Sequence, residues 1–215
     1  MIRRFGLYVI LTNPVVGYEA AAEAAVAEGV TYLQLRMKNA PQEKLIQTAH
    51  AIRAITAKTA TRFIVNDDVE IAMIVNADGV HLGQDDMDLD TARAKWNQPG
   101  KHFGLSTHNP LQAAKALEKK PDYIGVGPVF ATPTKVIPDP VVGLKTMGEI
   151  IAATPLTTVA IGGIDEDNLD DVLAYGAINF CAVRAIMQSD RPRQVIQRMM
   201  TAWREAEARR GFDPD

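Results

Sequence analysis

Short apolar runs alternate with longer stretches of helical period along this chain of 215 residues. The short runs are rich in β-branched residues and predict strands, whereas the longer stretches predict helices. Strands that are apolar on both faces indicate a parallel sheet covered by helices. The expected strands cover 7–11, 32–35, 62–65, 79–82, 102–105, 123–126, 158–161 and 179–182, and the expected helices cover 18–28, 42–57, 69–75, 88–96, 110–119, 143–153, 168–174 and 192–209.

The number of these units decides the expected architecture. Eight strand–helix pairs in 215 residues average about 27 residues each, which is close to the minimum for a β-α unit. We therefore predict an α/β protein with a single (β/α)8 TIM-barrel domain over residues 1–215. An open doubly wound sheet is the alternative, but no G-x-G-x-x-G follows the first strand. The Pro-rich stretch 137–140 is short enough to be a loop inside one domain.

Several helix ends carry recognisable signals. Asn109 can cap a helix that takes Pro110 at its first position. Ser189 or Asp190 is expected to cap the last helix in the same way. Gly29 and Gly176 stand where helices end and can supply the left-handed residue that a C-terminal turn needs.

Composition narrows the class of protein. Apolar residues make up 47% and charged residues 23%, as in an ordinary soluble globular protein. The net charge of −3 gives no electrostatic reason to expect nucleic acid or an anionic membrane as a partner. No apolar run is long enough for a membrane span, and the N-terminus lacks a signal-peptide pattern. With a lone Cys181, which cannot form an internal disulfide, the expected location is the cytoplasm.

Groups able to bind anions or a metal follow six or seven of the expected strands. In a parallel barrel, residues just past each strand converge on one common mouth. We therefore expect these groups to meet, although they are distant in sequence. They are Gln34, Arg36 and Lys38, then Asn66, Asp67 and Asp68, then Gln84, Asp85 and Asp86, then Ser106 and His108, then Thr132, Thr134 and Lys135, then Gly162 and Gly163, and finally Val183 and Arg184.

Two segments are typical of phosphate binding. The loop Ala-Thr-Pro-Thr-Lys at 131–135 offers two hydroxyls and an ammonium on a stiffened backbone. Gly162-Gly163 precedes a helix and can expose backbone N–H groups. Plainer interpretations stay open, because T-x-T-K occurs in ordinary turns and a glycine pair can be only a tight turn.

The carboxylates also have a plainer interpretation. Asn66 and Asp67 could merely cap the following helix, and Asp86 could cap a turn. His81 is expected to be a core or supporting residue rather than a reacting one.

Charge arithmetic gives the acids a second explanation. A diphosphate brings roughly three negative charges, and a like-charge pair at about 4 Å costs about 4 kcal/mol at an effective dielectric of 20. Arg36, Lys38 and Lys135 offset the phosphates but do not explain Asp67 and Asp86. A divalent ion does, and a few oxygen ligands completed by phosphates are typical of Mg²⁺. Metal spacings of His-x-His or His-x₃-His are absent from the sequence, which argues against zinc.

From residue 7 to residue 186 the chain resembles the thiamine-phosphate synthase (thiamine-phosphate pyrophosphorylase) family. The motifs that carry the resemblance are Gln-Leu-Arg-Met-Lys at 34–38, Asn66-Asp67, the segment 78–86, the segment 123–130, the T-x-T-K loop and Ala-Ile-Gly-Gly-Ile at 160–164. The family fold is a compact TIM barrel, in agreement with the count above. Met37 stands where glutamate is common in the family, and Arg184 stands where serine is frequent.

The resemblance implies a transferase of thiamine biosynthesis. It implies that hydroxymethylpyrimidine diphosphate loses pyrophosphate while the ring nitrogen of a thiazole phosphate bonds to the exposed methylene, and that the enzyme is a homodimer. The implied ligand sets are Gln34, Arg36, Lys38, Asn66, Ser106 and Lys135 for the pyrimidine diphosphate, Asp67 and Asp86 for Mg²⁺, and Thr132, Thr134, Gly163, Val183 and Arg184 for the thiazole phosphate.

Three other functions remain as alternatives. A thiazole tautomerase shares the barrel, but such relatives tend to lack the paired aspartates and the T-x-T-K loop. A non-catalytic barrel could bind a phosphorylated ligand as a sensor. A phosphosugar isomerase or epimerase would need a matched acid and base across the mouth.

Overall fold

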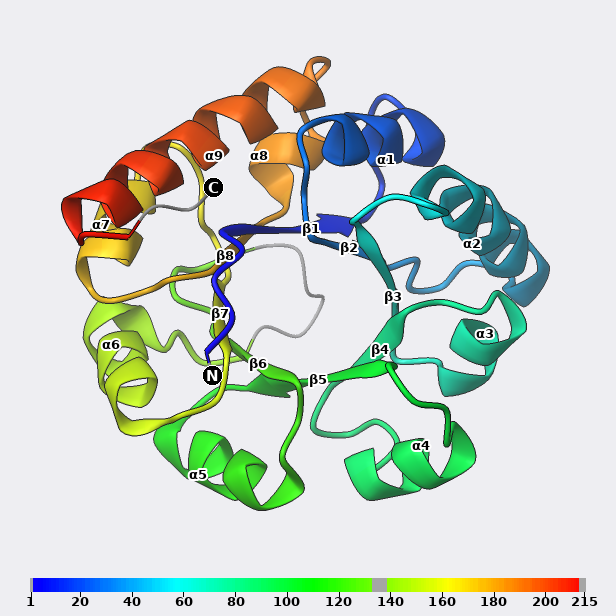
Figure 1. Cartoon of the computed structure of the whole chain (residues 1–215), viewed down its shortest axis with the longest axis horizontal. Coiled ribbons are helices and arrows are strands. Elements are labelled where there is room, and N and C mark those ends of the chain that lie inside the picture. Colours follow the sequence, from blue (N-terminus) through cyan, green and yellow to red (C-terminus); the bar gives the residue numbers. More distant parts are fainter. Residues whose placement is uncertain (1, 133–138, 213–215) are drawn as a thin grey trace.

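Eight parallel strands close into a barrel in chain order in this computed structural model, which describes residues 2–132 and 139–212. Each strand pairs with the next, and the eighth pairs with the first (Figure 1). The predicted (β/α)8 TIM barrel is confirmed. The strands are β1 (Leu7–Leu11), β2 (Tyr32–Leu35), β3 (Arg62–Asn66), β4 (Gly79–Leu82), β5 (His102–Thr107), β6 (Tyr123–Val126), β7 (Thr158–Ile161) and β8 (Phe180–Ala182).

The helices form a ring around the barrel (Figure 1). Each of the eight predicted helices is present, with ends within one residue of the prediction, and the short α8 was not predicted. The helices are α1 (Tyr18–Ala27), α2 (Gln42–Thr56), α3 (Val69–Ile74), α4 (Leu89–Lys95), α5 (Pro110–Lys119), α6 (Gly143–Ala153), α7 (Leu169–Ala174), α8 (Arg184–Met187) and α9 (Pro192–Arg209).

Strand β5 is two residues longer than predicted. Ser106 and Thr107 continue the register and pair with Gly125 and Val126 of β6. The Thr107 hydroxyl, fully buried, donates to the Gly125 carbonyl at 2.8 Å. This extension places Ser106 on the sheet itself, so its side chain rests on a rigid element.

Most of the predicted helix ends are confirmed. The Asn109 side chain accepts a hydrogen bond from the Gln112 N–H at 2.9 Å, and Pro110 occupies the first helical position. Gly29 (φ +71°) and Gly176 (φ +101°) both have the left-handed conformation.

The predicted cap of α9 is wrong. The helix begins at Pro192, its N-cap residue is Arg191, and no side chain caps it. Ser189 instead accepts a hydrogen bond from the Arg191 N–H at 3.0 Å, so its hydroxyl stabilises the turn before the helix.

Aromatic side chains fill the inside of the barrel. The rings of Tyr8, Tyr32 and Tyr123 have centroids 5.5–5.6 Å apart, and all three residues are buried. Together with Phe5 they form an inner cluster distinct from the core between the strands and the helices. A filled interior leaves the loops at the ends of the strands as the place for ligands.

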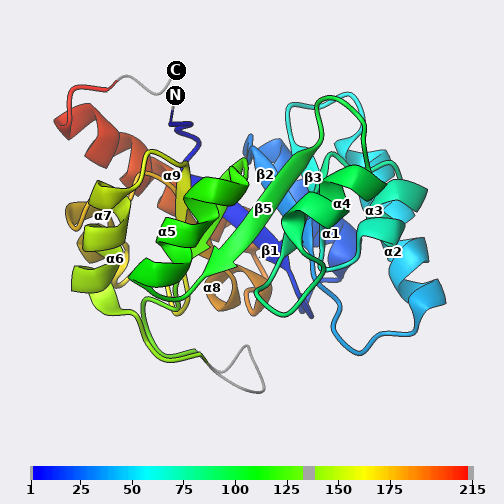
Figure 2. The same ribbon diagram turned by 90° about the horizontal axis from the view of Figure 1, so that it is seen from below.

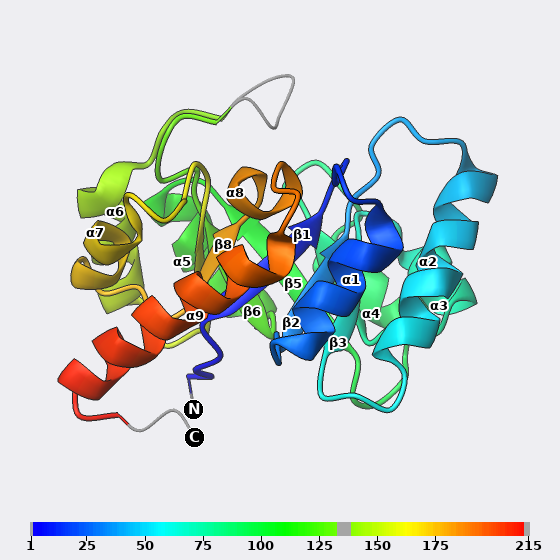
Figure 3. The same cartoon turned by 90° about the horizontal axis from the view of Figure 1, so that it is seen from above.

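The two ends of the barrel differ in what covers them. Side views show the N-terminal segment at the same end as the last turn of α9 (Figure 2, Figure 3). Arg4 forms an ion pair with Glu207 there. The loops that leave the carboxyl ends of the strands lie at the opposite end. Within the part of the chain that the structure describes, no helix combines the length and apolarity needed to cross a bilayer.

Candidate active site

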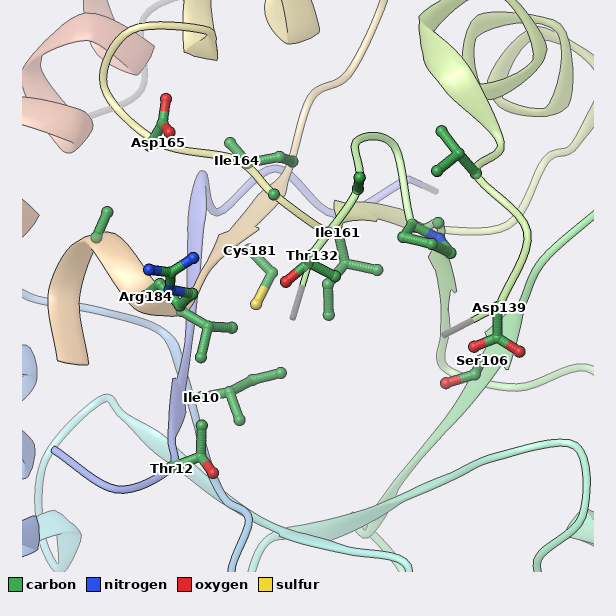
Figure 4. Close-up of a pocket in the computed structure, with 18 of the residues that line it drawn as sticks. Ile10, Thr12, Ser106, Thr132, Asp139, Ile161, Ile164, Asp165, Cys181 and Arg184 are labelled. Carbon is green, nitrogen blue, oxygen red and sulfur yellow. The ribbon is translucent and has the colours of Figure 1, made fainter. Parts of the chain in front are cut away.

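A cavity of 950 Å³ lies at the carboxyl ends of the strands (Figure 4). Figure 4 places Arg184 on one side of it and Ser106 with Asp139 on the other, with Thr132 between them. The strand-end pattern therefore identified much of this wall. The predicted residues that line the cavity are Arg36, Ser106, His108, Thr132, Gly162, Gly163, Val183 and Arg184.

The turn after β7 is built for close approach. Gly162 (φ +104°) and Gly163 (φ +66°) both have the left-handed conformation, which glycine adopts without strain. A Cβ atom on Gly163 would lie 2.7 Å from the Cβ of Phe130. The Phe130 N–H donates to the Gly162 carbonyl at 2.9 Å. The loop that carries Thr132 is thus packed directly on the glycine turn.

Asp67 and Asp86 meet near Arg36, a residue of the cavity wall, although neither acid lines the cavity itself. Burial and the hydrogen bond with the Asp67 carboxyl raise the pKa of Asp86 above its usual value. The Gly83 N–H donates to Asp86 Oδ2 at 2.6 Å, and a Cβ on Gly83 would lie 2.9 Å from that oxygen. Lys38 Nζ lies 2.9 Å from Asp67 Oδ2. Two acids are therefore held together; Lys38 forms an ion pair with Asp67, and its charge also acts on Asp86.

Helix capping does not explain Asp67. The cap of α3 is Asp68, whose carboxylate accepts from the Ile71 N–H at 2.8 Å. Asp67 has a left-handed backbone (φ +64°), and its N–H donates to the His81 carbonyl of β4 at 2.8 Å. A non-glycine residue held in this region by its surroundings is typical of functional sites.

Arg36 connects the acidic pair to the cavity. It follows β2 directly, and its N–H donates to the Leu11 carbonyl at 2.9 Å. Burial lowers the pKa of its guanidinium, and the Asp67 carboxylate opposes that shift. Because Arg36 also lines the cavity, its charge links the acids to the cavity wall.

The donor chemistry of the acidic pair fits Mg²⁺. Over residues 2–132 and 139–212, no three His, Cys, Asp or Glu side chains gather as a metal site. Mg²⁺ is commonly held by one or two carboxylates together with substrate phosphates and waters. Burial and the contact with Asp67 raise the pKa of Asp86, and a cation bound to the pair would favour its ionised form.

Other predicted residues lie outside the cavity wall. Gln34 is buried, and its Nε2 donates to the Tyr8 hydroxyl at 2.9 Å, so it sits inside the barrel. Asn66 is the half-buried last residue of β3 and pairs with His81. Thr134 and Lys135 lie outside the described residues.

The wall also includes polar residues that the strand-end pattern did not single out. Thr12 directly follows β1, so the same rule could have found it. Gln188 follows α8, a helix too short to leave a periodic pattern. Asp139 carries an oxygen 3.7 Å from His108 Nε2, while His108 Nδ1 lies 2.6 Å from the Gly127 carbonyl.

Comparisons with known proteins identify the family of this chain. A family profile described as thiamine monophosphate synthase matches residues 7–186. A thiamine-phosphate synthase from Synechocystis sp. is 40% identical over 93% of this chain, which spans only 57% of that protein's length. A thiamine-phosphate synthase from Chloroflexus aurantiacus is 39% identical over 80% of this chain and 79% of its own.

A solved structure adds the fold. The thiamine phosphate pyrophosphorylase from Pyrococcus furiosus superposes with a TM-score of 0.85 and 31% identity, covering 94% of this chain and 96% of its own. Sequence and fold thus agree over nearly the whole chain, and the resemblance noted above is confirmed. The chain belongs to the thiamine monophosphate synthase family.

Proposed function

We propose that this protein joins hydroxymethylpyrimidine diphosphate to a thiazole phosphate, forming thiamine phosphate and releasing pyrophosphate. The observation that carries the proposal is the contact between Asp67 and Asp86 next to Arg36, which lines the cavity. A tautomerase needs no metal site, and a phosphosugar isomerase would need its acid and base across the mouth, whereas these two acids are in contact with each other. Membership of the family supports the same conclusion.

The diphosphate is assigned to the side of the mouth that holds the acids. Asp67 and Asp86 would hold Mg²⁺, which when bound supplies positive charge to the departing diphosphate. Arg36 and Lys38 stand at the same rim, and Lys135 is assigned there from the sequence. Each preorganised donor of this kind is worth about 3–4 kcal/mol of transition-state stabilisation.

The slow step is the separation of the diphosphate from the benzylic-type carbon of the pyrimidine. An electron-rich aminopyrimidine can carry the resulting cation, so the path is dissociative. The thiazole nitrogen needs no deprotonation, and the site accordingly needs no general base. Asn66 and Ser106 complete the proposed pyrimidine diphosphate site, whereas the buried Gln34 donates to Tyr8 instead.

The thiazole phosphate is assigned to the opposite wall. Gly163 and the Val183–Arg184 backbone offer N–H groups, and Thr132 and Thr134 offer hydroxyls. Arg184 lines the cavity on this side and adds a charge. Holding both substrates in one mouth adds the gain from proximity.

One coupled assay tests the proposal. Both substrates are mixed with the protein and MgCl₂, and pyrophosphate and thiamine phosphate are measured together. We expect both products in equal amounts, and no reaction when either substrate or the metal is omitted.

Other outcomes separate the alternatives. Isomerisation of the thiazole without pyrophosphate release would identify a tautomerase. Binding of the thiazole phosphate without turnover would identify a sensor. Pyrophosphate release without thiamine phosphate would mean that the diphosphate site is correct and the thiazole site is not.

We also propose, from the family resemblance and the sequence, that the enzyme works in the cytoplasm as a homodimer. The lone, buried Cys181, which cannot form an internal disulfide, is compatible with the first statement. Sedimentation equilibrium tests the second, and a monomer at micromolar concentration would contradict it.

A further inference from the structure

Five polar side chains form a line of hydrogen bonds through the barrel, from its interior to the cavity. Gln34 Nε2 donates to the Tyr8 hydroxyl at 2.9 Å, and that hydroxyl lies 2.8 Å from the Tyr123 hydroxyl. Tyr123 lies 3.2 Å from His81 Nδ1, and His81 Nε2 lies 2.9 Å from Ser106 Oγ. Only the last member, Ser106, lines the cavity.

Burial isolates most of this line from water. Gln34, Tyr8 and Tyr123 are each exposed by no more than 2%. Burial also raises the pKa of the phenols of Tyr8 and Tyr123, so both keep their protons. A buried group that cannot reach water must use the partners it has, and here each partner is a neighbour in the line.

The direction of the line follows from counting protons. Tyr8 accepts from the Gln34 amide, so its own proton is left for the Tyr123 oxygen. The Tyr123 proton then goes to His81 Nδ1, which must accept it. A neutral imidazole that accepts at Nδ1 carries its proton on Nε2 and donates from there to Ser106 Oγ.

The opposite direction fails at the buried end. If Ser106 donated to His81, then Tyr123 would donate to Tyr8, which already accepts from Gln34. The Tyr8 proton would then have no acceptor within the line, at a site where burial makes an unmade hydrogen bond costly.

The sheet leaves room for this line at one glycine. A Cβ atom on Gly104, in the middle of β5, would lie 2.2 Å from Cζ of Tyr123 and 2.5 Å from His81 Nδ1. Glycine inside a strand often marks a place where another group approaches closely. Here that group is the Tyr123–His81 pair, whose rings also stack with centroids 5.5 Å apart.

We propose that Tyr123 and His81 are positioning residues. Tyr123 holds His81 as its Nε2–H tautomer, and His81 in turn aims the Ser106 hydroxyl proton into the cavity. Ser106 then acts as a fixed donor to a substrate oxygen, and it does not have to reorient when the diphosphate departs. The kinetic part of this inference rests on the proposed function, because it assigns Ser106 to the pyrimidine diphosphate site.

The tautomer is tested on the free protein, without any substrate. The chain has four histidines, so the ¹⁵N-labelled imidazole signals can be assigned by substitution. We expect His81 to be the Nε2–H tautomer in the wild type and a mixture of both tautomers in Tyr123→Phe. An Nδ1–H tautomer in the wild type would overturn the proposal.

The kinetic test is a double-mutant cycle. Tyr123→Phe is expected to lower kcat about tenfold with KM changed less than about twofold. Ser106→Ala is expected to lower kcat more, and Tyr123→Phe added to Ser106→Ala should cost nothing further. Additive losses would mean that Tyr123 acts independently of Ser106, which would overturn the proposal.

Tyr32→Phe is the matched control. Its ring belongs to the same aromatic cluster, 5.5 Å from that of Tyr123, but its hydroxyl accepts from Arg3 and takes no part in the line. We expect it to change neither the tautomer of His81 nor kcat. An effect as large as that of Tyr123→Phe would mean that general packing is responsible, and would overturn the proposal.

A second pair of variants covers the case in which Tyr123→Phe fails to fold. The amide nitrogen of His81→Gln can stand near the original Nε2 and donate to Ser106, whereas the shorter His81→Asn cannot. The first should retain more turnover than the second, and equal losses would overturn the proposal. If the wild type forms no thiamine phosphate, the proposed function fails, and the tautomer measurement still decides the inference.

Discussion

The two ends of the barrel differ in how their charged side chains are paired. One end is covered by the N-terminal segment and the last turn of α9, and we call it the closed end (Figure 2, Figure 3). Glu207 is fully buried there and forms ion pairs with both Arg4 and Arg210. At the mouth, the carboxyls of Asp67 and Asp86 are in contact, and Asp67 has a left-handed backbone. One end pairs a buried acid with two arginines, whereas the other holds two carboxyls in contact with Lys38 paired to Asp67, an arrangement to which a bound cation would add further positive charge.

The same contrast applies to cations. Arg3 at the closed end donates to the Tyr32 hydroxyl at 3.0 Å and lies 3.0 Å from His102 Nδ1. Arg36 at the mouth lines a cavity, and burial lowers the pKa of its guanidinium. We therefore expect substitutions at the closed end to change stability and substitutions at the mouth to change turnover.

The largest expected effect is on turnover, from Asp67→Asn. Asparagine adopts the left-handed conformation readily, so the backbone at φ +64° should be kept. The variant loses a carboxylate charge from the acidic pair, and we expect kcat to fall about 10²–10³-fold. The melting temperature should change little, as measured by thermal denaturation in EDTA.

Asp68→Asn is the matched control for this change. It alters the adjacent carboxylate, which caps α3, and asparagine caps helices about as well as aspartate. It should keep both turnover and stability. Full activity in Asp67→Asn, or wild-type activity without Mg²⁺, would contradict the metal assignment.

The next effect is on stability, from Glu207→Gln at the closed end. Removing the carboxylate leaves Arg4 and Arg210 without their buried partner, at a cost of about 3 kcal/mol. For a chain of this size that lowers the melting temperature by about 6–12 °C. The kcat of the folded variant should be unchanged.

Glu166→Gln provides the comparison on the surface. Glu166 also binds an arginine through two oxygens, at 2.6 and 3.1 Å from Arg198, but the pair is exposed. Its loss should cost less than about 1 kcal/mol. If Glu207→Gln and Glu166→Gln lost the same free energy of unfolding, burial would not strengthen the ion pairs at the closed end.

The sequence was sufficient for the barrel because each strand is a short, continuous apolar run between recognisable turns. It also predicted that Asp67 and Asp86 would converge, since a parallel barrel brings every carboxyl strand end to one mouth. Helix α8 was missed because four residues, Arg184–Met187, are too few to set a period.

The inner hydrogen-bond line was also beyond the reach of the sequence. Which of the inward residues of β1, β2, β4, β5 and β6 touch depends on the stagger of the strands around the barrel, and periodicity carries no information on stagger. Gln34 was assigned to the substrate, yet its amide donates to Tyr8. A strand pattern gives the face on which a residue lies and not its partner across the barrel.

The smallest expected effect is a pH dependence at the closed end. Burial lowers the pKa of His102 below its usual value of 6.5, against the opposing pull of Asp122. The folded protein therefore binds this proton less readily than the unfolded chain, so stability is complete above pH 6.5 and falls as the pH drops from there. In His102→Asn the amide oxygen can still accept a hydrogen bond from Arg3. This substitution should flatten the decline in stability at low pH, and the change in the free energy of unfolding should be smaller than the loss caused by Glu207→Gln. Urea denaturation between pH 5 and 8 measures it, with the exposed His50→Asn as control. The same decline in His102→Asn as in the wild type would show that other groups at the closed end titrate instead.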